Sequence, residues 1–347
     1  MDVLSEILKL VKLEGAFFFN AEFSAPWCLK SVEASTAAAY LPPVLGRPII
    51  YHFLTEGRAY ARLGSGQPEE LQAGDIVIFP HGDEHFLGNG SPAEPVDSLR
   101  TWAKSLDQGL KVARHGGGGE RTRFVCGYMA CEPRWSHTFL ASLPKMMKVS
   151  VTNDSSGRWI ENSIRYSVSE ANGRQAGGEL VLSRLSELLF VETLRLYINR
   201  LPAEQTGWLA GTRDPVVGEA LALLHREVTH PWTVAALARR VGSSRTRLAE
   251  RFRHYLGEPP TKYLTKWRLR LGAEMLRSSE KSVAETASAV GYGSEAAFNR
   301  AFKREYSGPP AKFRRQQRSD GADSSVKSLK ASPRAADENG KFAAADV

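Results

Sequence analysis

The chain of 347 residues has only three cysteines, Cys28, Cys126 and Cys131, which is too few for a scaffold held together by disulfides. It also lacks any run of about 18 uncharged apolar residues, which excludes a membrane-spanning helix and leaves no expected contact with a membrane. A secretory signal would begin with basic residues, whereas this chain begins with Asp2 and Glu6. These absences favour a reduced protein of the cytoplasm.

Positive charge is distributed unevenly along the chain. Residues 213–318 hold 21 Lys or Arg and 10 Asp or Glu, a net charge of +11, whereas the rest of the chain carries −3. A chain of this length predicts two domains, each large enough to bury its own core. The asymmetry predicts a polyanion as the partner of the C-terminal domain.

The N-terminal half predicts a β-rich domain followed by a helix. Four stretches rich in β-branched and aromatic residues are separated by turn residues, which is typical of an antiparallel sandwich or barrel. After residue 178 the apolar residues recur at helical spacing. This second pattern fits a helix that covers the sheet and a helix that joins two subunits equally well. The predicted strands are 47–54, 59–63, 75–79 and 123–128, and the helical positions are Leu182, Leu185, Leu189 and Leu196.

The basic segment contains one pattern twice. Residues 233–256 predict two short helices with Gly242 in a tight turn between them, and residues 282–306 repeat the design around Gly291. A long helix over 263–276 joins the two units. Two helix-turn-helix units in a basic segment predict double-stranded DNA as the partner. The predicted helix N-caps are Thr233, Ser244, Ser282 and Ser294, with Asp214 before Pro215 at the start of the segment.

Residues 215–315 resemble the AraC/XylS-type DNA-binding domain over its whole length. The matching segments are LARRVGSSRTRLAERFRHYLGEPPTKYLTKWRLRLGAEML and VAETASAVGYGSEAAFNRAFKREYSGPPAKFRR. The resemblance implies seven helices, two of which enter adjacent segments of the major groove. Thr286 and Ser307 depart from the family pattern, which has an aliphatic residue and a glycine there. We expect Thr286 to loosen the second unit slightly.

The candidate DNA-binding residues lie on the outward faces of the second helix of each unit. The resemblance assigns base contacts to Thr246, Ala249 and Glu250 in the first unit, and to Glu295, Ala296, Asn299 and Arg300 in the second. Other basic residues on these faces are better placed for phosphates, which position the protein without specifying a sequence. These are Arg245, Arg247, Arg251 and Lys303, and the caps Ser244 and Ser294 complete the set.

The spacing Gly74-x5-Pro80-x-Gly82-x2-His85-x3-Asn89 matches the second cupin motif. The surrounding sequence, with YHFLTEGRAY at 51–60 and GDIVIFPHGDEH at 74–85, resembles the cupin-type sensor domain of many AraC-type regulators. The companion motif is incomplete, because Leu54 follows His52 where a second histidine is expected. Since a stable metal site needs three or four protein ligands, we expect no metal and no other cofactor. We expect His52 and His85 to bind a small organic ligand instead.

Together these features predict an α+β protein of two domains. A cupin-like β-barrel with covering helices spans 1–201, a linker 202–213, an all-α tandem helix-turn-helix domain 214–316, and a disordered tail 317–347. The predicted function is sequence-specific regulation of transcription, with an N-terminal domain that senses a small molecule, forms a homodimer, or does both. RNA polymerase is a further candidate partner. We expect no enzymatic activity; the alternative is a cupin-type metalloenzyme with an appended DNA-binding domain.

Overall fold

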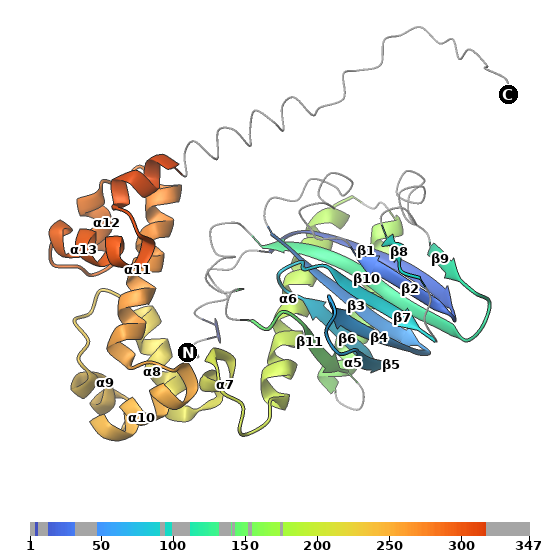
Figure 1. The fold of residues 1–347 in the computed structure, drawn as a ribbon, viewed down its shortest axis with the longest axis horizontal. Coiled ribbons are helices and arrows are strands. Elements are labelled where there is room, and N and C mark those ends of the chain that lie inside the picture. Colours follow the sequence, from blue (N-terminus) through green and yellow to red (C-terminus); the bar gives the residue numbers. More distant parts are fainter. Residues whose placement is uncertain are drawn as a thin grey trace, which may run out of the picture. The chain divides into compact units, whose positions relative to one another are not determined.

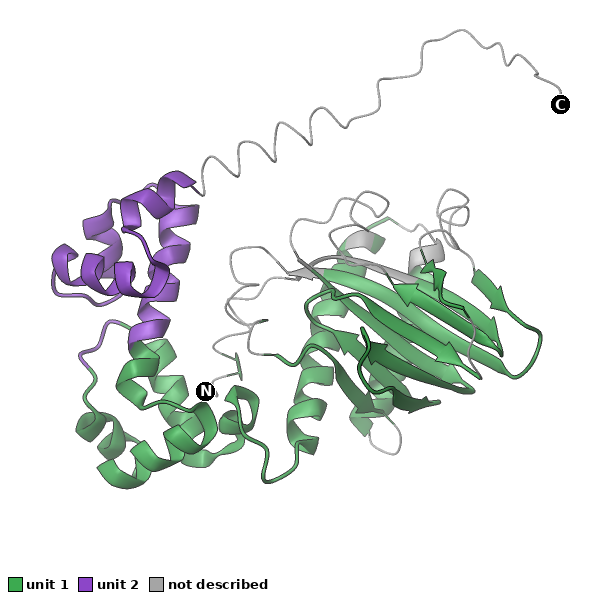
Figure 2. Ribbon diagram, in the orientation of Figure 1, with its two compact units in different colours: residues 1–228, 232–264 green, residues 229–231, 265–347 purple. Residues whose placement is uncertain are grey.

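The computed structural model describes residues 4–5, 13–31, 47–90, 94–98, 112–131, 140, 143–151, 155–173 and 176–316. The tail predicted over 317–347 lies outside the described residues. The chain divides into two compact units, Met1–Val228 with Trp232–Leu264, and Thr229–Pro231 with Thr265–Val347 (Figure 2). This division falls inside the helical part, between its two helix-turn-helix units.

Two β-sheets form the N-terminal half (Figure 1). Among the described strands they do not close into the predicted barrel. Neighbouring strands are antiparallel except for the parallel pairs β1–β9 and β2–β8. The six-stranded sheet has the order β11 (Met147–Ser150), β6 (Asp75–Phe79), β3 (Arg47–Glu56), β10 (Arg121–Cys131), β1 (Leu13–Ser24) and β9 (Val112–Gly116). The five-stranded sheet has the order β5 (Glu69–Gln72), β4 (Arg58–Leu63), β7 (His85–Asn89), β2 (Trp27–Ser31) and β8 (Val96–Asp97).

The six-stranded sheet is the middle layer and is buried on both faces. In β3, Tyr51 and Phe53 belong to the core between this sheet and the helices, whereas Leu54 belongs to the core between the two sheets. Ile76 and Val77 of β6 divide in the same way. Because side chains alternate between the faces of a strand, a strand buried on both faces reads as a continuous apolar run. This explains the uninterrupted apolar stretch DIVIF of β6.

Helices α5 (Ser155–Gly173) and α6 (Gly178–Arg200) cover the outer face of the six-stranded sheet. The sequence did not predict α5, because its Ser, Asn and Gly residues weaken the apolar pattern. Helix α6 confirms the predicted apolar helix. For three of the four predicted leucines it also decides between a helix that covers the sheet and a helix that joins two subunits. Leu182, Leu189 and Leu196 are 9%, 5% and 8% exposed and belong to the core, so these leucines cover the sheet.

Eight helical segments follow in the described residues, and seven of them, the last at 310–316, begin within the range 215–315 for which the resemblance implied seven helices. Helix α7 occupies the second half of the predicted linker and buries Leu209 and Ala210, so the irregular connection is shorter than expected and spans residues 201–207. No helix in the described part of the chain is long and apolar enough to cross a bilayer. The helices are α7 (Trp208–Arg213), α8 (Pro215–Arg226), α9 (Val234–Arg240), α10 (Arg245–Leu256), α11 (Pro260–Ser278), α12 (Val283–Ala289) and α13 (Glu295–Tyr306).

Each helix-turn-helix unit has its own apolar centre. In the first unit, the inward positions Leu248 and Phe252 of α10 are fully buried, as the pattern predicted. In the second, Phe298 and Phe302 of α13 are fully buried in a separate cluster with residues of α11 and α12. Thr286 is also buried, and its hydroxyl donates a hydrogen bond of 2.9 Å to the Ser282 carbonyl. The polar group that we expected to loosen this unit is therefore satisfied within its own helix.

Candidate nucleic-acid interface and sensor core

The two predicted recognition helices, α10 and α13, begin at side-chain caps. The Ser244 hydroxyl accepts a hydrogen bond of 3.2 Å from the backbone N–H of Arg247, and the Ser294 hydroxyl accepts one of 3.2 Å from that of Ala297. In each unit the preceding turn contains a glycine with positive φ, +63° in one and +83° in the other. A cap satisfies an otherwise unpaired N–H, and glycine makes the left-handed turn without strain. The serine caps and the glycine turns therefore determine the residue at which each recognition helix, and with it the outward face of that helix, begins.

Most of the predicted DNA-binding residues share exposed faces. Asn299 and Ala249 are partly exposed, and the Asn299 amide donates a long hydrogen bond of 3.4 Å to Glu295. On each helix the structure therefore brings together a polar surface of the kind that reaches base edges and phosphates in a major groove. The exposed members are Arg245, Thr246, Arg247 and Glu250 on α10, and Glu295, Ala296, Arg300 and Lys303 on α13.

Arg251 differs from the other predicted phosphate contacts, because its guanidinium binds the buried carboxylate of Asp214. Arg251 Nε donates a hydrogen bond of 2.9 Å to Asp214 Oδ2, and a second guanidinium nitrogen contacts the same oxygen. Asp214 Oδ1 accepts from the backbone N–H groups of Val216 and Val217, which caps α8. Burial acts to raise the pKa of Asp214, but the hydrogen bonds from Arg251 and the backbone lower it overall. The sequence predicted the cap but not this ion pair.

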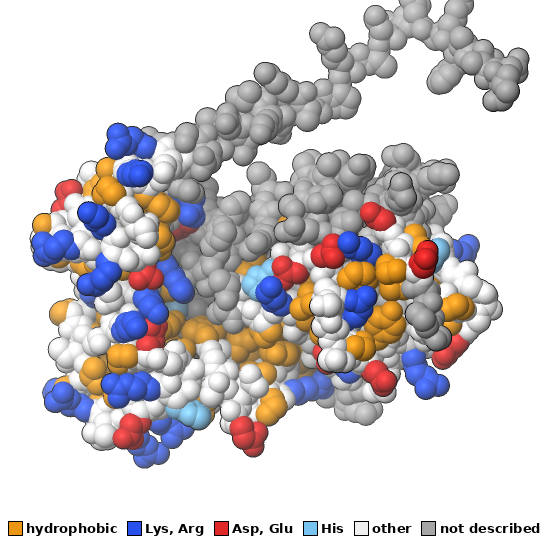
Figure 3. Space-filling model, in the orientation of Figure 1, with side chains coloured by type: hydrophobic (Ala, Val, Ile, Leu, Met, Phe, Trp, Pro, Cys, Tyr) orange, Lys and Arg blue, Asp and Glu red, His pale blue; other side chains and the backbone are white. Residues whose placement is uncertain are grey.

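Basic side chains gather over the helical part of the molecule. In the view of Figure 3, Lys and Arg side chains are spread over the surface of that part, with Asp and Glu side chains among them. This distribution agrees with the net charge of +11 over residues 213–318. Such a surface attracts the phosphate backbone of DNA without regard to its sequence.

His52 and His85 meet in the core between the two sheets, one from each sheet. Their Nε2 atoms are 2.9 Å apart. His52 Nδ1 lies 3.0 Å from the Cys126 sulfur, and His85 Nδ1 lies 2.9 Å from the Asp83 carbonyl oxygen. A carbonyl can only accept, so His85 Nδ1 donates and its Nε2 accepts from His52 Nε2 in a neutral pair. His52 Nδ1 then accepts from the Cys126 thiol.

Burial keeps this chain of hydrogen bonds neutral. Burial lowers the pKa of His85 to about 4, although the bond to the Asp83 carbonyl works in the opposite direction. Burial, and then the neighbouring His85, hold the pKa of His52 well below its usual value. Burial also raises the pKa of the Cys126 thiol, which makes that thiol a poor nucleophile. Because all four ring nitrogens have partners, a ligand could reach His52 or His85 only by separating the two rings.

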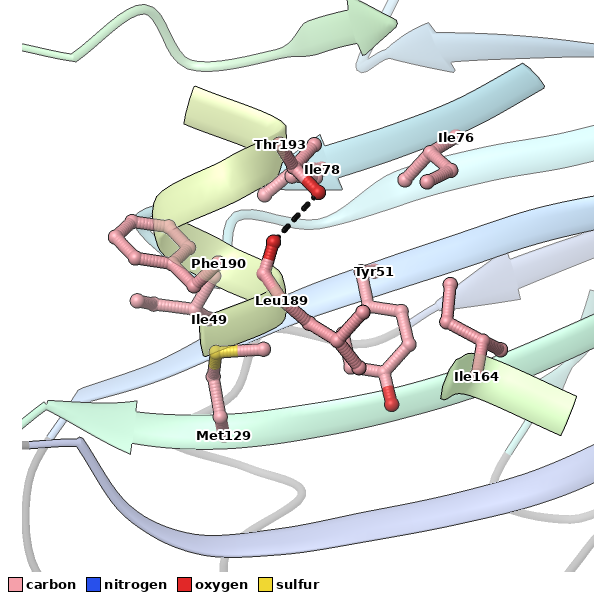
Figure 4. A pocket seen from close by; sticks show the side chains of 9 residues that line it. All are labelled: Ile49, Tyr51, Ile76, Ile78, Met129, Ile164, Leu189, Phe190 and Thr193. Atoms are coloured by element: carbon pink, nitrogen blue, oxygen red, sulfur yellow. Dashed lines mark hydrogen bonds between the residues drawn. The ribbon is translucent and has the colours of Figure 1, made fainter. Parts of the chain in front are cut away.

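No group of three or more His, Cys, Asp or Glu side chains in the described residues is arranged to hold a metal ion. A small cavity lies on the opposite face of the six-stranded sheet, beneath α6 (Figure 4). This cavity of about 20 Å³ is lined by Ile, Leu, Met and Phe side chains together with Tyr51 and Thr193. The Thr193 hydroxyl is occupied, since it donates a hydrogen bond of 2.7 Å to the Leu189 carbonyl. The cavity is about large enough for one water molecule, but its lining is almost entirely apolar and provides few hydrogen-bond partners for a water.

Comparisons with known proteins agree with this organisation. A family model described as "Cupin" matches residues 2–199, and one described as "Helix-turn-helix domain" matches residues 237–316. A putative AraC-like transcription regulator of Streptomyces lividans is 30% identical over 320 residues, which cover 91% of this chain and 98% of that protein. The HTH-type transcriptional regulator AlkR of Acinetobacter baylyi is 26% identical over 324 residues, 91% of this chain and 100% of AlkR. A solved regulator structure with an AraC-type DNA-binding domain, from Chromobacterium violaceum, is 30% identical with a TM-score of 0.29, over 31% of this chain and 96% of that one.

A cupin-like domain followed by two helix-turn-helix units defines a class of transcription regulators that bind DNA. Nearly full-length similarity at 30% identity then identifies the family. The chain belongs to the AraC-type transcription regulators.

Proposed function

We propose that this protein regulates transcription by reading a specific DNA sequence with α10 and α13, and that it is not an enzyme. The observation that carries the proposal is the pair of capped helices whose exposed polar faces lie within a segment of net charge +11. On each face, side chains that we expect to reach base edges alternate with basic side chains that we expect to reach phosphates.

Arg300 and Lys303 on α13 test the division between base reading and phosphate binding. Both side chains are exposed, and they lie one turn apart. Arg300→Ala should relax the preference at one or two base pairs and cost about 1–3 kcal/mol at the preferred site. Lys303→Ala should weaken binding to all sequences by a similar factor. Binding to a set of duplexes with single base-pair changes would measure both, and a uniform loss for both variants would contradict the role of Arg300.

We further propose that the N-terminal domain senses a small molecule, and that the cavity beneath α6 supports this role better than the histidine pair does. An effector larger than one water molecule would enter by displacing the lining, of which Leu189, Phe190 and Thr193 belong to α6. Helix α6 continues through residues 201–207 into α7, and the Arg213 guanidinium donates a hydrogen bond of 2.6 Å to the Leu201 carbonyl at the start of this connection. A shift of α6 would then change the connection to the DNA-binding domain, and DNA binding would change effector affinity reciprocally.

Two variants separate the cavity from the histidine pair. Thr193→Ile adds volume at the cavity wall, whereas His85→Gln alters only the core between the two sheets. If the effector enters beneath α6, Thr193→Ile should abolish the response of a reporter gene to a panel of small apolar molecules, and His85→Gln should retain it. The reverse result would favour the histidine pair, as the sequence predicted.

Other partners complete the proposal. We propose that the protein acts as a homodimer and influences RNA polymerase at its promoters, which cross-linking of the DNA-bound complex would test.

The alternative function, a cupin-type metalloenzyme, requires a resident metal. Stoichiometric metal in the purified protein that is lost on replacing His85 would support that alternative.

A further inference from the structure

A hollow of about 310 Å³ lies between α5 and the six-stranded sheet, and neither DNA reading nor the cavity beneath α6 involves it. Strands β1, β3, β9 and β10 line it together with α5. Its volume is in the range of sites for small molecules. Half of the lining residues are polar or charged, in contrast to the cavity beneath α6, and the other half are Ala, Val and Phe. The polar and charged members are Asn20, Glu22, Thr55, Arg123 and Arg165.

Strand register brings the polar residues of the sheet together on the face that α5 covers. Glu22 lies opposite Arg123 in the register of β1 with β10, and Asn20 lies opposite Val125. Side chains two residues apart point to the same face of a strand, so all four residues share one face. Val125 belongs to the core that also contains residues of α5 and α6. The hollow is therefore a polar continuation of the face whose apolar part packs against these helices.

Two arginines line the hollow, Arg123 from the sheet and Arg165 from α5. Arg123 Nη1 donates a hydrogen bond of 2.8 Å to Glu56, and Arg165 donates two, of 3.1 and 2.8 Å, from Nε and Nη2 to Glu161. Each guanidinium keeps further donors. Among the described residues, Arg165 Nη1 has no hydrogen-bond partner, and neither does the buried Arg123 Nε, although it lies 3.3 Å from a Glu22 oxygen. The two guanidinium groups are therefore held in place and retain donors for an anion.

The charge and polarity of the lining identify the class of ligand. With two Arg and one Glu, the lining carries a net charge of +1. Glu22 does not cancel both arginines, because it is also paired with Arg114 at 3.0 Å, outside the lining. A net charge of +1 is balanced by one carboxylate, whose planar shape matches the guanidinium fork, and not by a phosphate with up to two negative charges.

The remaining polar groups of the lining fit a hydroxyl group. The Thr55 hydroxyl donates a hydrogen bond of 3.1 Å to the Arg123 carbonyl, which leaves its oxygen free to accept. The Asn20 amide, which both donates and accepts, makes no hydrogen bond within the part of the chain that the structure describes. A small carboxylate that also carries a hydroxyl would therefore find a partner for each polar group, and its carbon atoms would contact the Ala, Val and Phe side chains.

We propose that this hollow binds a small hydroxycarboxylate, with its carboxylate on Arg123 and Arg165 and its hydroxyl on Asn20 or Thr55. This site goes beyond the proposed function, since it lies apart from both the DNA-reading helices and the histidine pair. Arg165 follows Ile164, which lines the cavity beneath α6. A ligand that joins the helix to the sheet at Arg165 would therefore also hold α5 at that cavity.

A ligand-observed NMR titration of the full-length protein with lactate, lactamide and inorganic phosphate tests the proposal, at constant ionic strength. Lactate should bind saturably at about millimolar concentrations, as expected for so small a ligand. Lactamide has the same carbon skeleton and hydroxyl without the negative charge, and should not bind. Absence of saturable lactate binding, or equal binding of lactamide, would overturn the proposal. Tighter binding of phosphate than of lactate would show an anion site of a different class and overturn the assignment to a carboxylate.

Arg165→Gln should weaken lactate binding about tenfold or more, because a charge-assisted hydrogen bond is lost. Arg195→Gln is the matched control. Arg195 is exposed on α6 and pairs with Glu192 of its own helix, as Arg165 pairs with Glu161, so this variant loses an equivalent ion pair outside the hollow. Circular dichroism would establish that both variants retain their helices. Wild-type affinity in Arg165→Gln, or an equal loss in Arg195→Gln, would contradict a site at the hollow.

Discussion

Arg251 shows how one contact changes the role expected of a residue. Its guanidinium binds a carboxylate that also caps α8, so Arg251→Ala would leave the buried carboxylate of Asp214 without its charged partner. We expect a loss of about 1.5–3 kcal/mol in the free energy of unfolding, measured with urea. DNA affinity should fall for all sequences alike, because the recognition helix is less firmly held.

Arg247→Ala is the control for Arg251, because Arg247 is exposed on the same helix. It should change the unfolding free energy by less than about 0.5 kcal/mol while still weakening DNA binding. If the two variants are equally stable, the ion pair to Asp214 does not contribute to the free energy of unfolding. Arg251 would then be assigned to the phosphate contacts, as the sequence predicted.

Buried histidines should make the protein sensitive to acid. The pKa of His85 is lowered by burial to about 4, and that of His225 in the DNA-binding domain to about 3. Between about pH 6.5 and 4 the unfolded chain therefore binds protons that the folded chain does not, and the free energy of unfolding falls by up to about 1.4 kcal/mol per pH unit for each such group. Urea unfolding at pH 7.5, 6 and 5 would measure this. His85→Gln should reduce the dependence, and an unchanged dependence in that variant would contradict the assignment.

The sequence led us to expect His52 and His85 at a common ligand inside the N-terminal domain, but not the hydrogen bonds that join them to each other and to Cys126. His52 lies opposite Cys126 in the register of β3 with β10, and His85 comes from the other sheet. These contacts depend on strand register and on how two sheets stack, and both are set by residues far apart in the chain. The exposed polar faces of α10 and α13 could be predicted, since helix periodicity and caps are local signals.

At the scale of elements, the C-terminal ends of α10 and α13 can be compared directly, because they differ in the residue that ends the helix. Both helices end at a residue with left-handed backbone, Gly257 with φ +70° and Ser307 with φ +57°. Serine is strained in this conformation and glycine is not. Ser307→Gly should therefore raise the unfolding free energy by about 0.5–1 kcal/mol, and Gly257→Ser should lower it by a similar amount, as measured with urea. Equal stability of Ser307→Gly and the wild type would show that this helix end tolerates serine without cost.

The helices of the DNA-binding domain could be predicted more fully than the sheets. The serine and threonine caps gave the starts of α9, α10, α12 and α13 to the residue. Helix α7 falls within the predicted linker, because its six residues are too few to show a helical period. Strands such as β1 and β9 pair in the sheet across some ninety residues of chain, and no local pattern carries that information. For the same reason a barrel was expected where two separate sheets form.

At the scale of the whole molecule, the division of charge determines how salt should act. The excess positive charge lies in residues 213–318, so each DNA-binding domain neutralises phosphates while the rest of the chain, at −3, does not. The logarithm of the DNA-binding constant should then fall with the logarithm of salt concentration, with a slope of about −0.9 per phosphate contacted. A dimer that places two domains on DNA with two recognition sites should show about twice the slope measured on DNA with one site. Fluorescence anisotropy over a salt series would measure both slopes. A wild-type slope near zero on both DNAs would contradict phosphate binding itself, whereas equal non-zero slopes would show that one domain binds at a time.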